Sequence, residues 1–210
     1  MMSVEIHHLG IQDYQSTYEA MQEFTQNRDE QTPDQMWVLE HPSIFTLGLA
    51  GDFNHLLDHN TEIPLIQVDR GGQITYHGPG QIIIYLLCDL KRMGIYVKEF
   101  VFRIEEALIN TLAQFQIEAQ REPGAPGIYI NSGHPTFAGA KIAALGLKVT
   151  KHCTYHGLAL NVNMDLAPFH LINPCGYPDL ETVDLASLGV KVESQEIAKA
   201  LVIELQQRLQ

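Results

Sequence analysis

The strongest constraint on the fold is one continuously apolar stretch, "GQIIIYLLCDL", which runs from Gly80 to Leu90. It is rich in β-branched residues and holds no charged residue before Asp89. A run of this kind is typical of a β-strand that is buried on both faces. The sequence therefore predicts a sheet whose interior strand is covered from either side.

The remaining segments alternate irregularly between helical and strand patterns. Apolar side chains recur at helical spacing over residues 14–24, 100–115 and 197–209, which predicts three helices. Short apolar runs predict strands at "MWVLEH", "SIFTLG", "GIYI", "AKIAALGLKV" and "YHGLALNVNMD". This order favours an α+β fold, an α/β-type sandwich in which a mixed β-sheet is flanked by helices. No linker or internal repeat is visible, so residues 1–210 are expected to form a single domain.

The charge balance limits the classes of partner. The chain has 25 acidic and 13 basic residues, a net charge of -12. Nucleic acids and anionic membranes need a basic field, so neither is expected as a partner. The 3 cysteines form no disulfide framework, and the sequence shows no signal peptide or membrane-length apolar run. We therefore expect a reducing compartment, the cytoplasm.

A glycine-rich segment, "RGGQITYHGPGQ" from Arg70 to Gln81, is the first candidate for a binding element. Its four glycines allow main-chain N–H groups to approach a ligand closely. The segment matches neither the dinucleotide-binding fingerprint nor the P-loop. From the residues alone, a loop that cradles a ligand and a glycine-rich hairpin are both open interpretations.

Lys141 is unusual because it stands alone among small and aliphatic residues in "TFAGAKIAALG". If this segment is a strand, the ammonium would enter a confined and partly dry space. Desolvation there would lower its pKa and make it a potential base. The alternative is a lysine whose stem lies along apolar surface while its head reaches water.

The three cysteines differ in their setting. Cys88 belongs to the buried strand and is expected to act as a small apolar residue. Cys153 lies near His152 and His156, but the spacing fits no standard zinc pattern, so no metal is expected. Cys175, in "LINPCGYPD", lies between a proline and a glycine. Such a turn either presents a nucleophile to a cleft or is an ordinary loop.

Several long motifs, taken in order, cover nearly the whole chain: "DQMWVLEHPSIFTLGLAG", "RGGQITYHGPGQIIIYLLCDL", "GAPGIYI", "GAKIAALGLKV", "HGLALNV" and "INPCGY". Together they resemble the lipoyl(octanoyl) transferases, the octanoyl-[acyl-carrier-protein]:protein N-octanoyltransferases. The resemblance implies an acyltransferase with the fold of the biotin and lipoate ligase catalytic domain. The chain departs from the family at Leu86, where proline is common, and at Ala186, where threonine is common. It also differs in the middle of "TKHCTYHG".

The resemblance also implies the site residues. Cys175 corresponds to the family's nucleophile, which carries the acyl group as a thioester, and Lys141 to the residue that lowers the thiol's pKa and acts as general base and acid. The implied substrate-binding residues are Arg70, Gly71, Gly72, Gln73, Ile74, Thr75, Tyr76, His77, Ala144, Leu145, Gly146, Gly157, Leu158 and Ala159. No cofactor is implied. We expect Tyr76, Leu145 and Leu158 to line an acyl slot. Backbone N–H groups near Leu145 and Gly146, with His77, are the candidate oxyanion donors.

The implied activity moves an octanoyl or lipoyl group from acyl carrier protein to one lysine of a lipoyl domain, the first step of endogenous protein lipoylation. The implied acceptors are the lipoyl domains of 2-oxoacid dehydrogenase complexes and the glycine cleavage H protein. Arg70, Lys148 and Lys151 are expected to form a basic docking patch for the acidic carrier. Three alternatives remain open: an ATP-dependent lipoate or octanoate ligase of the same fold, an amidotransferase acting between lipoyl domains, and a non-catalytic module that binds the carrier or a lipoyl domain.

Overall fold

The computed structural model describes residues 4–178 and 180–209. Within them the strands form one seven-stranded and one three-stranded sheet. The order of the larger sheet is β1 (Glu5–Ile11), β2 (Gln35–Glu40), β6 (Gln81–Leu87), β10 (Cys153–Asn161), β9 (Lys141–Thr150), β8 (Ala125–Ile130) and β7 (Ala119–Glu122). Only β1 and β2 pair in parallel there. The smaller sheet has the order β4 (Leu65–Gln67), β3 (Ile44–Leu47) and β5 (Ile74–His77).

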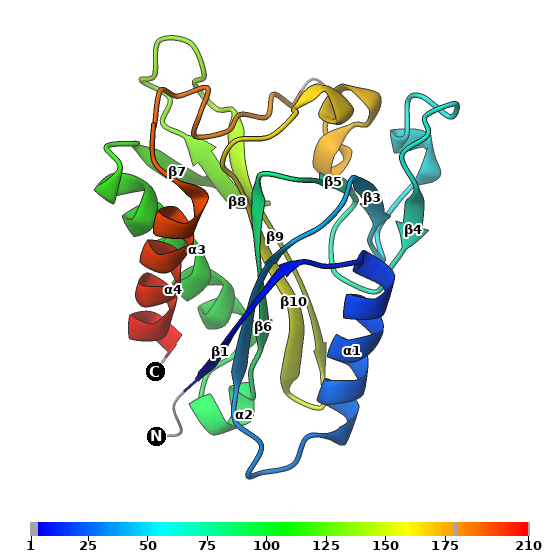
Figure 1. Cartoon of the computed structure of the whole chain (residues 1–210), viewed down its shortest axis with the longest axis vertical. Coiled ribbons are helices and arrows are strands. Elements are labelled where there is room, and N and C mark those ends of the chain that lie inside the picture. The colour runs from blue at the N-terminus through cyan, green and yellow to red at the C-terminus, as the bar shows by residue number, and fades with distance from the viewer. Residues whose placement is uncertain (1–3, 179, 210) are drawn as a thin grey trace.

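Helices cover both faces of the larger sheet (Figure 1). Helix α1 (Tyr14–Asn27) lies on one side, while α3 (Val97–Gln114) and α4 (Ser194–Leu209) lie on the other. The short helix α2 (Leu90–Met93) follows β6 directly. Helix α1 begins where the side chain of Asp13 accepts a hydrogen bond from the backbone N–H of Ser16. The predicted sandwich of a mixed sheet between helices is confirmed.

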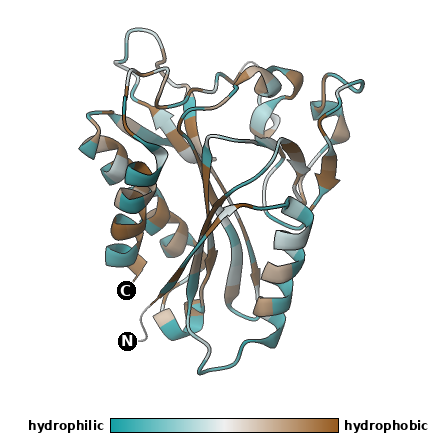
Figure 2. Ribbon diagram, in the orientation of Figure 1, coloured by the Kyte–Doolittle hydropathy of each residue, from teal (hydrophilic) through white to brown (hydrophobic). Residues whose placement is uncertain are grey.

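Strand β6 shows why the apolar run requires two covering layers. Successive side chains of a strand point to opposite faces. Ile82, Ile84 and Leu86 therefore join the core beneath α3 and α4. Ile83, Tyr85 and Leu87 pack in a second cluster that includes residues of α1. Figure 2 shows hydrophobic residues concentrated on the central strands and hydrophilic ones on the connecting turns.

The three predicted helices and the six predicted strand segments are present, but several elements were missed. The missed strands and α-helix are β1, β4, β5, β7 and α2. Most are short or lie at sheet edges: β1 and β7 flank the larger sheet and carry exposed or half-buried residues. Such strands need no continuous apolar run, so periodicity does not reveal them. In the part of the chain that the structure describes, no helix combines the length and hydrophobicity needed to cross a bilayer.

Candidate active site

The two residues singled out as nucleophile and base meet at one end of the larger sheet. Lys141 is the first residue of β9, and Cys175 lies in a 3-10 turn, Pro174–Gly176. The Lys141 Nζ donates a hydrogen bond to the Cys175 Sγ at 3.0 Å, although 34 positions separate them in the chain. In Figure 1 the segment after β10 passes over the upper end of the sheet, where β9 begins. The thiol of this turn is therefore paired with an amine.

The backbone holds Cys175 in an unusual conformation. Its φ is +56°, in the left-handed region, and the φ of the next residue, Gly176, is +78°. Two hydrogen bonds hold the turn. The Asn173 N–H donates to the His55 carbonyl at 2.8 Å, and within the turn the Gly176 N–H donates to the Asn173 carbonyl at 2.9 Å. A non-glycine residue in this region costs about 1–3 kcal/mol and persists where its surroundings enforce it. The strain is thus located at the candidate nucleophile.

Strand β8 provides the other contacts of the lysine. The Lys141 Nζ donates to the Pro126 carbonyl at 2.9 Å and lies 5.2 Å from the centre of the Tyr129 ring. Gly127 leaves the space that the lysine side chain fills, because a Cβ there would come within 2.6 Å of Lys141 Cε. These residues were not predicted as parts of the site. One sequence signal could have pointed to them, namely Gly127 inside the strand segment "GAPGIYI". A glycine within a strand often marks a place where another group approaches the backbone closely.

The environment of Lys141 is as confined as expected, but its pKa is not lowered. The residue is only 5% exposed. Burial lowers the pKa of Lys141, and the attraction of Cys175 and Tyr129 outweighs burial, so the net pKa lies above its ordinary value. The prediction of a lowered pKa is wrong because it considered desolvation without the neighbouring sulfur. The neighbouring sulfur therefore favours the ammonium form of Lys141.

A cavity of about 400 Å³ extends from this pair along β9 and β10. All of the predicted substrate-binding residues line it except Tyr76. Lining residues that the sequence analysis missed include Tyr14 of α1, Tyr85 of β6 and His156 of β10. They come from three separate elements and share no local motif. Only their packing around the sheet brings them together.

Tyr76 does not line the acyl slot as expected. It lies in β5, where strand alternation directs Thr75 and His77 toward the cavity. Tyr76 instead packs beside Phe45 and Phe169, and its hydroxyl lies 2.9 Å from the Ser43 hydroxyl. It supports the smaller sheet from behind the cavity wall.

Arg70 is a buried part of the wall and not part of a docking surface. It is 8% exposed and donates hydrogen bonds to Thr46 and to the carbonyls of Gly71 and Gln73. The Gly71 N–H donates to the Leu147 carbonyl at 2.9 Å, which attaches the loop to β9. Residues 70–73 therefore form a loop on the cavity, and residues 74–77 form a strand. The interpretation as a glycine-rich hairpin is wrong, because β5 and β6 belong to different sheets and do not pair, and the loop that cradles a ligand stays a prediction.

The other members of the expected docking patch lie away from Cys175. Lys148 is seven positions along β9 from Lys141, and Lys151 is in the turn that follows β9. At ~3.3 Å per residue, Lys148 lies roughly 23 Å along the strand from Lys141. Because Arg70 is buried, the three residues of the predicted docking patch do not form one surface beside Cys175 and Lys141.

His77 is a neutral wall residue. Its Nδ1 lies 2.8 Å from Gln81 Oε1, and its Nε2 lies 3.5 Å from Thr46 Oγ1. The amide oxygen can only accept, so Nδ1 carries the proton and Nε2 is left as an acceptor. Burial and the nearby His41 lower the pKa of His77 to about 3. His77 therefore does not fit the predicted role of oxyanion donor.

The other two cysteines are not part of this site. Cys88 is fully buried just after β6, and burial raises the pKa of its thiol. Its expected apolar role is confirmed. Cys153 begins β10 and its thiol faces the Lys151 carbonyl, while His156 bonds to Asp69. Among the described residues, no three His, Cys, Asp or Glu side chains gather in a way that could hold a metal ion.

The chain is similar in sequence to known proteins over nearly its whole length. The sequence model of the lipoyl protein ligase A/B catalytic domain matches residues 13–206. An octanoyltransferase of Polynucleobacter asymbioticus is 58% identical over 211 residues, 99% of each chain. An octanoyltransferase of Ralstonia pickettii is 52% identical over 100% of this chain and 96% of its own.

Solved structures support the fold. A bi-partite lipoate protein ligase of Thermoplasma acidophilum, solved in a study of that ligase and its E2 lipoyl domain, has a TM-score of 0.78 at 16% identity, covering 100% of this chain and 84% of its own. Lipoate-protein ligase A bound with ATP has a TM-score of 0.76 at 17% identity, with coverages of 99% and 86%. A biotin protein ligase of Aquifex aeolicus has a TM-score of 0.56 at 11% identity, with coverages of 100% and 70%.

Proposed function

The chain belongs to the lipoyl protein ligase A/B catalytic domain family and, within it, to the octanoyltransferases, which are acyltransferases, and from this premise we propose a mechanism for its octanoyl transfer in protein lipoylation. The donor is the octanoyl thioester of acyl carrier protein, and the acyl group passes through a thioester on Cys175. The observation that carries this proposal is the hydrogen bond of 3.0 Å between Lys141 and Cys175 beside a cavity.

In the first half-reaction the Cys175 sulfur attacks the carbonyl carbon of the carrier thioester. The Lys141 ammonium favours the thiolate, because an adjacent cation stabilises the charged form of a thiol. The tetrahedral intermediate collapses, its bond to the carrier sulfur breaks, and the carrier thiolate takes up a proton. One thioester replaces another, so the step is nearly balanced in free energy and needs no ATP. Lys141 is the group in place to supply the proton.

In the second half-reaction the neutral amine of an acceptor lysine attacks the octanoyl-Cys175 carbonyl. An amide forms, the Cys175 thiolate leaves, and the proton lost by the amine is taken up at the reactive pair. The change from thioester to amide makes this step downhill. The proposed acceptors are the lipoyl domains of 2-oxoacid dehydrogenase complexes and the glycine cleavage H protein. The study of the Thermoplasma ligase together with its E2 lipoyl domain supports lipoyl domains as the class of acceptor.

The cavity provides for the acyl chain and for the oxyanion. Leu145 and Leu158 are opposite each other on β9 and β10 and form an apolar part of the wall. Each methylene buried against such a wall contributes about 0.8 kcal/mol. With His77 excluded as a donor, backbone N–H groups near Leu145 and Gly146 remain our candidates for the oxyanion.

All three cysteines are free thiols, which supports a reducing compartment such as the cytoplasm.

The test is an intact-mass measurement after incubation with octanoyl-acyl carrier protein, without ATP and without acceptor. The wild type should gain one octanoyl increment that hydroxylamine removes. Cys175→Ser should not gain a hydroxylamine-labile increment, because its oxygen cannot form a thioester. Cys153→Ser is the matched control, since it removes another free thiol, at the start of β10, and should label like the wild type.

The rival functions predict other outcomes of the same experiment. A ligase would stay unmodified by the carrier thioester and would require free octanoate with ATP. A non-catalytic module would bind the carrier without gaining mass. Equal hydroxylamine-labile labelling of Cys175→Ser and the wild type would show that the acyl group is carried elsewhere and would contradict the proposed mechanism.

A further inference from the structure

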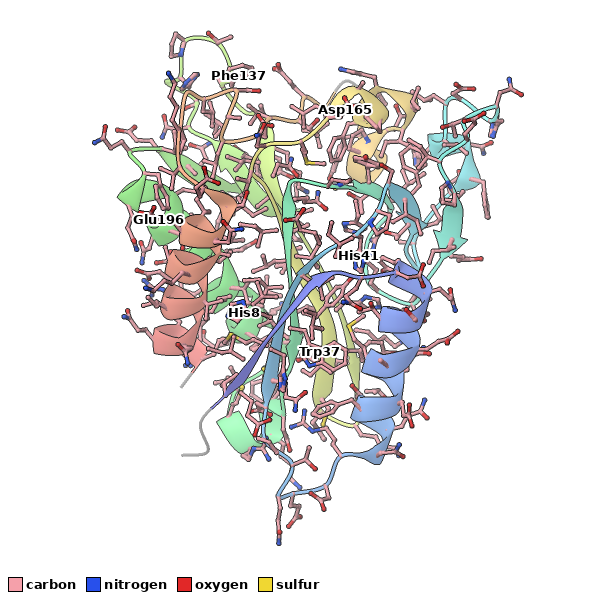
Figure 3. All side chains as sticks on the ribbon, in the orientation of Figure 1. His8, Trp37, His41, Phe137, Asp165 and Glu196 are labelled. Carbon is pink, nitrogen blue, oxygen red and sulfur yellow. The ribbon has the colours of Figure 1, made fainter. Side chains whose placement is uncertain are left out.

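Strand β8 contacts the reactive pair through Tyr129, a residue to which the proposed mechanism gives no role. Tyr129 lines the cavity and is 3% exposed. It lies near the end of β8, and Lys141 is the first residue of β9. In Figure 3 the loop that joins these strands, marked by Phe137, lies at the same end of the molecule as the segment after β10, marked by Asp165. Tyr129 is therefore at the end of the sheet where Lys141 meets Cys175.

An irregularity in the strand pairing brings Tyr129 and Lys141 together. Ile128 is opposite Ala143. An unbroken ladder would then place Tyr129 opposite Ile142, which belongs to the core beneath α3 and α4. The register shifts after Ile128, so that Tyr129 is opposite Lys141 instead. Directly opposite residues share a face of the sheet, and bulges of this kind often re-aim a side chain beside an active site.

The amine of Lys141 is enclosed by three groups. Its Nζ donates to the Pro126 carbonyl at 2.9 Å and to the Cys175 sulfur at 3.0 Å. It also lies over the Tyr129 ring, 5.2 Å from the ring centre. An ammonium has three N–H donors, so the two hydrogen bonds leave one donor for the ring. Gly127 keeps this arrangement open, because a Cβ there would come within 2.9 Å of Nζ.

The ring face, and not the hydroxyl, is what Tyr129 offers to the amine. The hydroxyl is buried and forms no hydrogen bond with any residue that the structure describes. Burial raises the pKa of Tyr129, so the phenol stays neutral at pH 7. A neutral aromatic ring attracts a cation within about 6 Å of its centre, most strongly where water is excluded. Lys141 is only 5% exposed, so this contact lies in such a place.

We propose that Tyr129 is a positioning residue whose ring face holds the Lys141 ammonium against the Cys175 sulfur. A ring that stabilises the ammonium favours the charged pair over the pair of neutral thiol and neutral amine. It also restricts the flexible lysine side chain, because moving the amine away from the ring loses this attraction. The inference rests on the proposed role of Lys141 in acyl transfer and names the residue through which β8 supports that role.

The test reads the protonation of Lys141 directly, through the ¹³C chemical shift of its ε-carbon in a pH titration. Cys175→Ser is the background, so that the amine titrates without the sulfur, and the Lys141 signal is the one that Lys141→Met lacks. The variants are Tyr129→Phe and phenylalanines at position 129 with one, two and three ring fluorines, which withdraw electrons from the ring face at almost constant shape. The titration midpoint should fall with each fluorine, by about 1 pH unit over the series, the size expected for a cation–π contact in a dry site.

A second cation–π pair provides the matched control. Phe102 is on α3, and the Arg121 guanidinium carbon lies 4.2 Å from the centre of its ring. Trifluorophenylalanine at position 102 should leave the Lys141 midpoint unchanged. Two simpler variants test the effect on octanoylation in single turnover. Tyr129→Phe keeps the ring and should react at nearly the wild-type rate, whereas Tyr129→Leu should be slower by roughly ten-fold or more, because the amine is no longer held in place.

The outcomes separate this inference from the proposed function, because the titration requires no acyl transfer. A midpoint that stays constant along the fluorine series, or equal slowing of octanoylation in Tyr129→Phe and Tyr129→Leu, would overturn the inference and leave the thioester mechanism standing. If the wild type gained no octanoyl group, the mechanism would be overturned, and a stepwise fall of the midpoint would still support the contact between ring and ammonium. If Tyr129→Leu fails to fold, the fluorine series decides alone.

Discussion

At the scale of single residues, the pair of Cys175 and Lys141 shows how two ordinary side chains acquire a special environment. The cysteine is held at φ +56° and the lysine is 5% exposed, so neither is free to move away from the other. The contact of 3.0 Å is charge-assisted if the sulfur is ionised. A fixed cation beside a thiol is the general arrangement for a reactive cysteine.

Removing the lysine amine should therefore slow acylation without unfolding the protein. We expect Lys141→Met to reduce the rate of octanoyl-thioester formation by about 10² to 10⁴ fold, the range for loss of a positioned acid or base. Lys148→Met is the control, because this lysine is on the same strand but far from Cys175. The measurement is single-turnover intact mass. An unchanged rate in Lys141→Met would contradict the assigned role.

The buried histidines make stability depend on pH. Burial, the first cause in each case, lowers the pKa of His41, His77 and His156. Below pH 6.5 the unfolded chain binds a proton at His77 that the folded chain does not bind until about pH 3. The contribution of the neutral, buried His77 to the stability of the fold is thus complete above pH 6.5. It is lost as the pH falls from 6.5 toward about 3.

We therefore expect the free energy of unfolding, measured by urea denaturation, to decrease between pH 6.5 and pH 5. The decrease should approach about 1.4 kcal/mol per pH unit for each histidine that stays neutral. His77→Gln should reduce the slope, whereas His59→Gln, at an exposed position, should leave it unchanged. A stability that is flat over this interval would show that these histidines are protonated in the folded protein.

At the scale of elements, one carboxylate joins the segments at the end of the sheet opposite the reactive pair. Asp34 Oδ1 accepts from Arg28 at 2.6 Å, from Arg92 at 2.5 Å and from the Asp89 N–H at 2.9 Å. Arg28 directly follows α1, Arg92 belongs to α2, and Asp89 lies between β6 and α2. The Arg28 side chain is 3% exposed, so its charge depends on Asp34.

Removing this carboxylate should destabilise the whole sheet. We expect Asp34→Ala to lower the free energy of unfolding by about 3 kcal/mol, because a buried guanidinium is left without its partner. Glu23→Ala, at an exposed position on α1, should change it by less than about 0.5 kcal/mol. Urea denaturation measures both variants. If Asp34→Ala and the wild type had equal free energies of unfolding, Arg28 and Arg92 would have to find other partners.

At the scale of the whole molecule, we propose that residues 1–210 fold as one domain. Helices α3 and α4 and the strands between them share one continuous core, and β6 connects that core to the cluster beneath α1. Calorimetry should therefore show one transition, with equal calorimetric and van't Hoff enthalpies. Two transitions would show that the three-stranded sheet or the α1 side unfolds separately.

The sequence alone was enough to identify the main elements and to single out Cys175 and Lys141 as candidates. The run Ile82–Leu87 can only be satisfied by a covered strand, and the stripes of α3 and α4 repeat at helical spacing, because local periodicity follows from backbone geometry. Cys175 and Lys141 were singled out by their local settings and by the family resemblance of two separate motifs, although 34 positions separate them in the chain. The edge strands β1 and β7 were missed because a half-exposed strand has no distinctive apolar pattern.

The tertiary structure decided how these pieces act together. The direction of the Lys141 pKa shift, the neutral acceptor role of His77 and the burial of Arg70 all depend on neighbours that are distant in sequence. The cavity wall likewise joins Tyr14, Tyr85 and His156 from three elements. Electrostatic energies and hydrogen bonds depend on distances of a few ångströms, and only the folded chain determines which groups come that close.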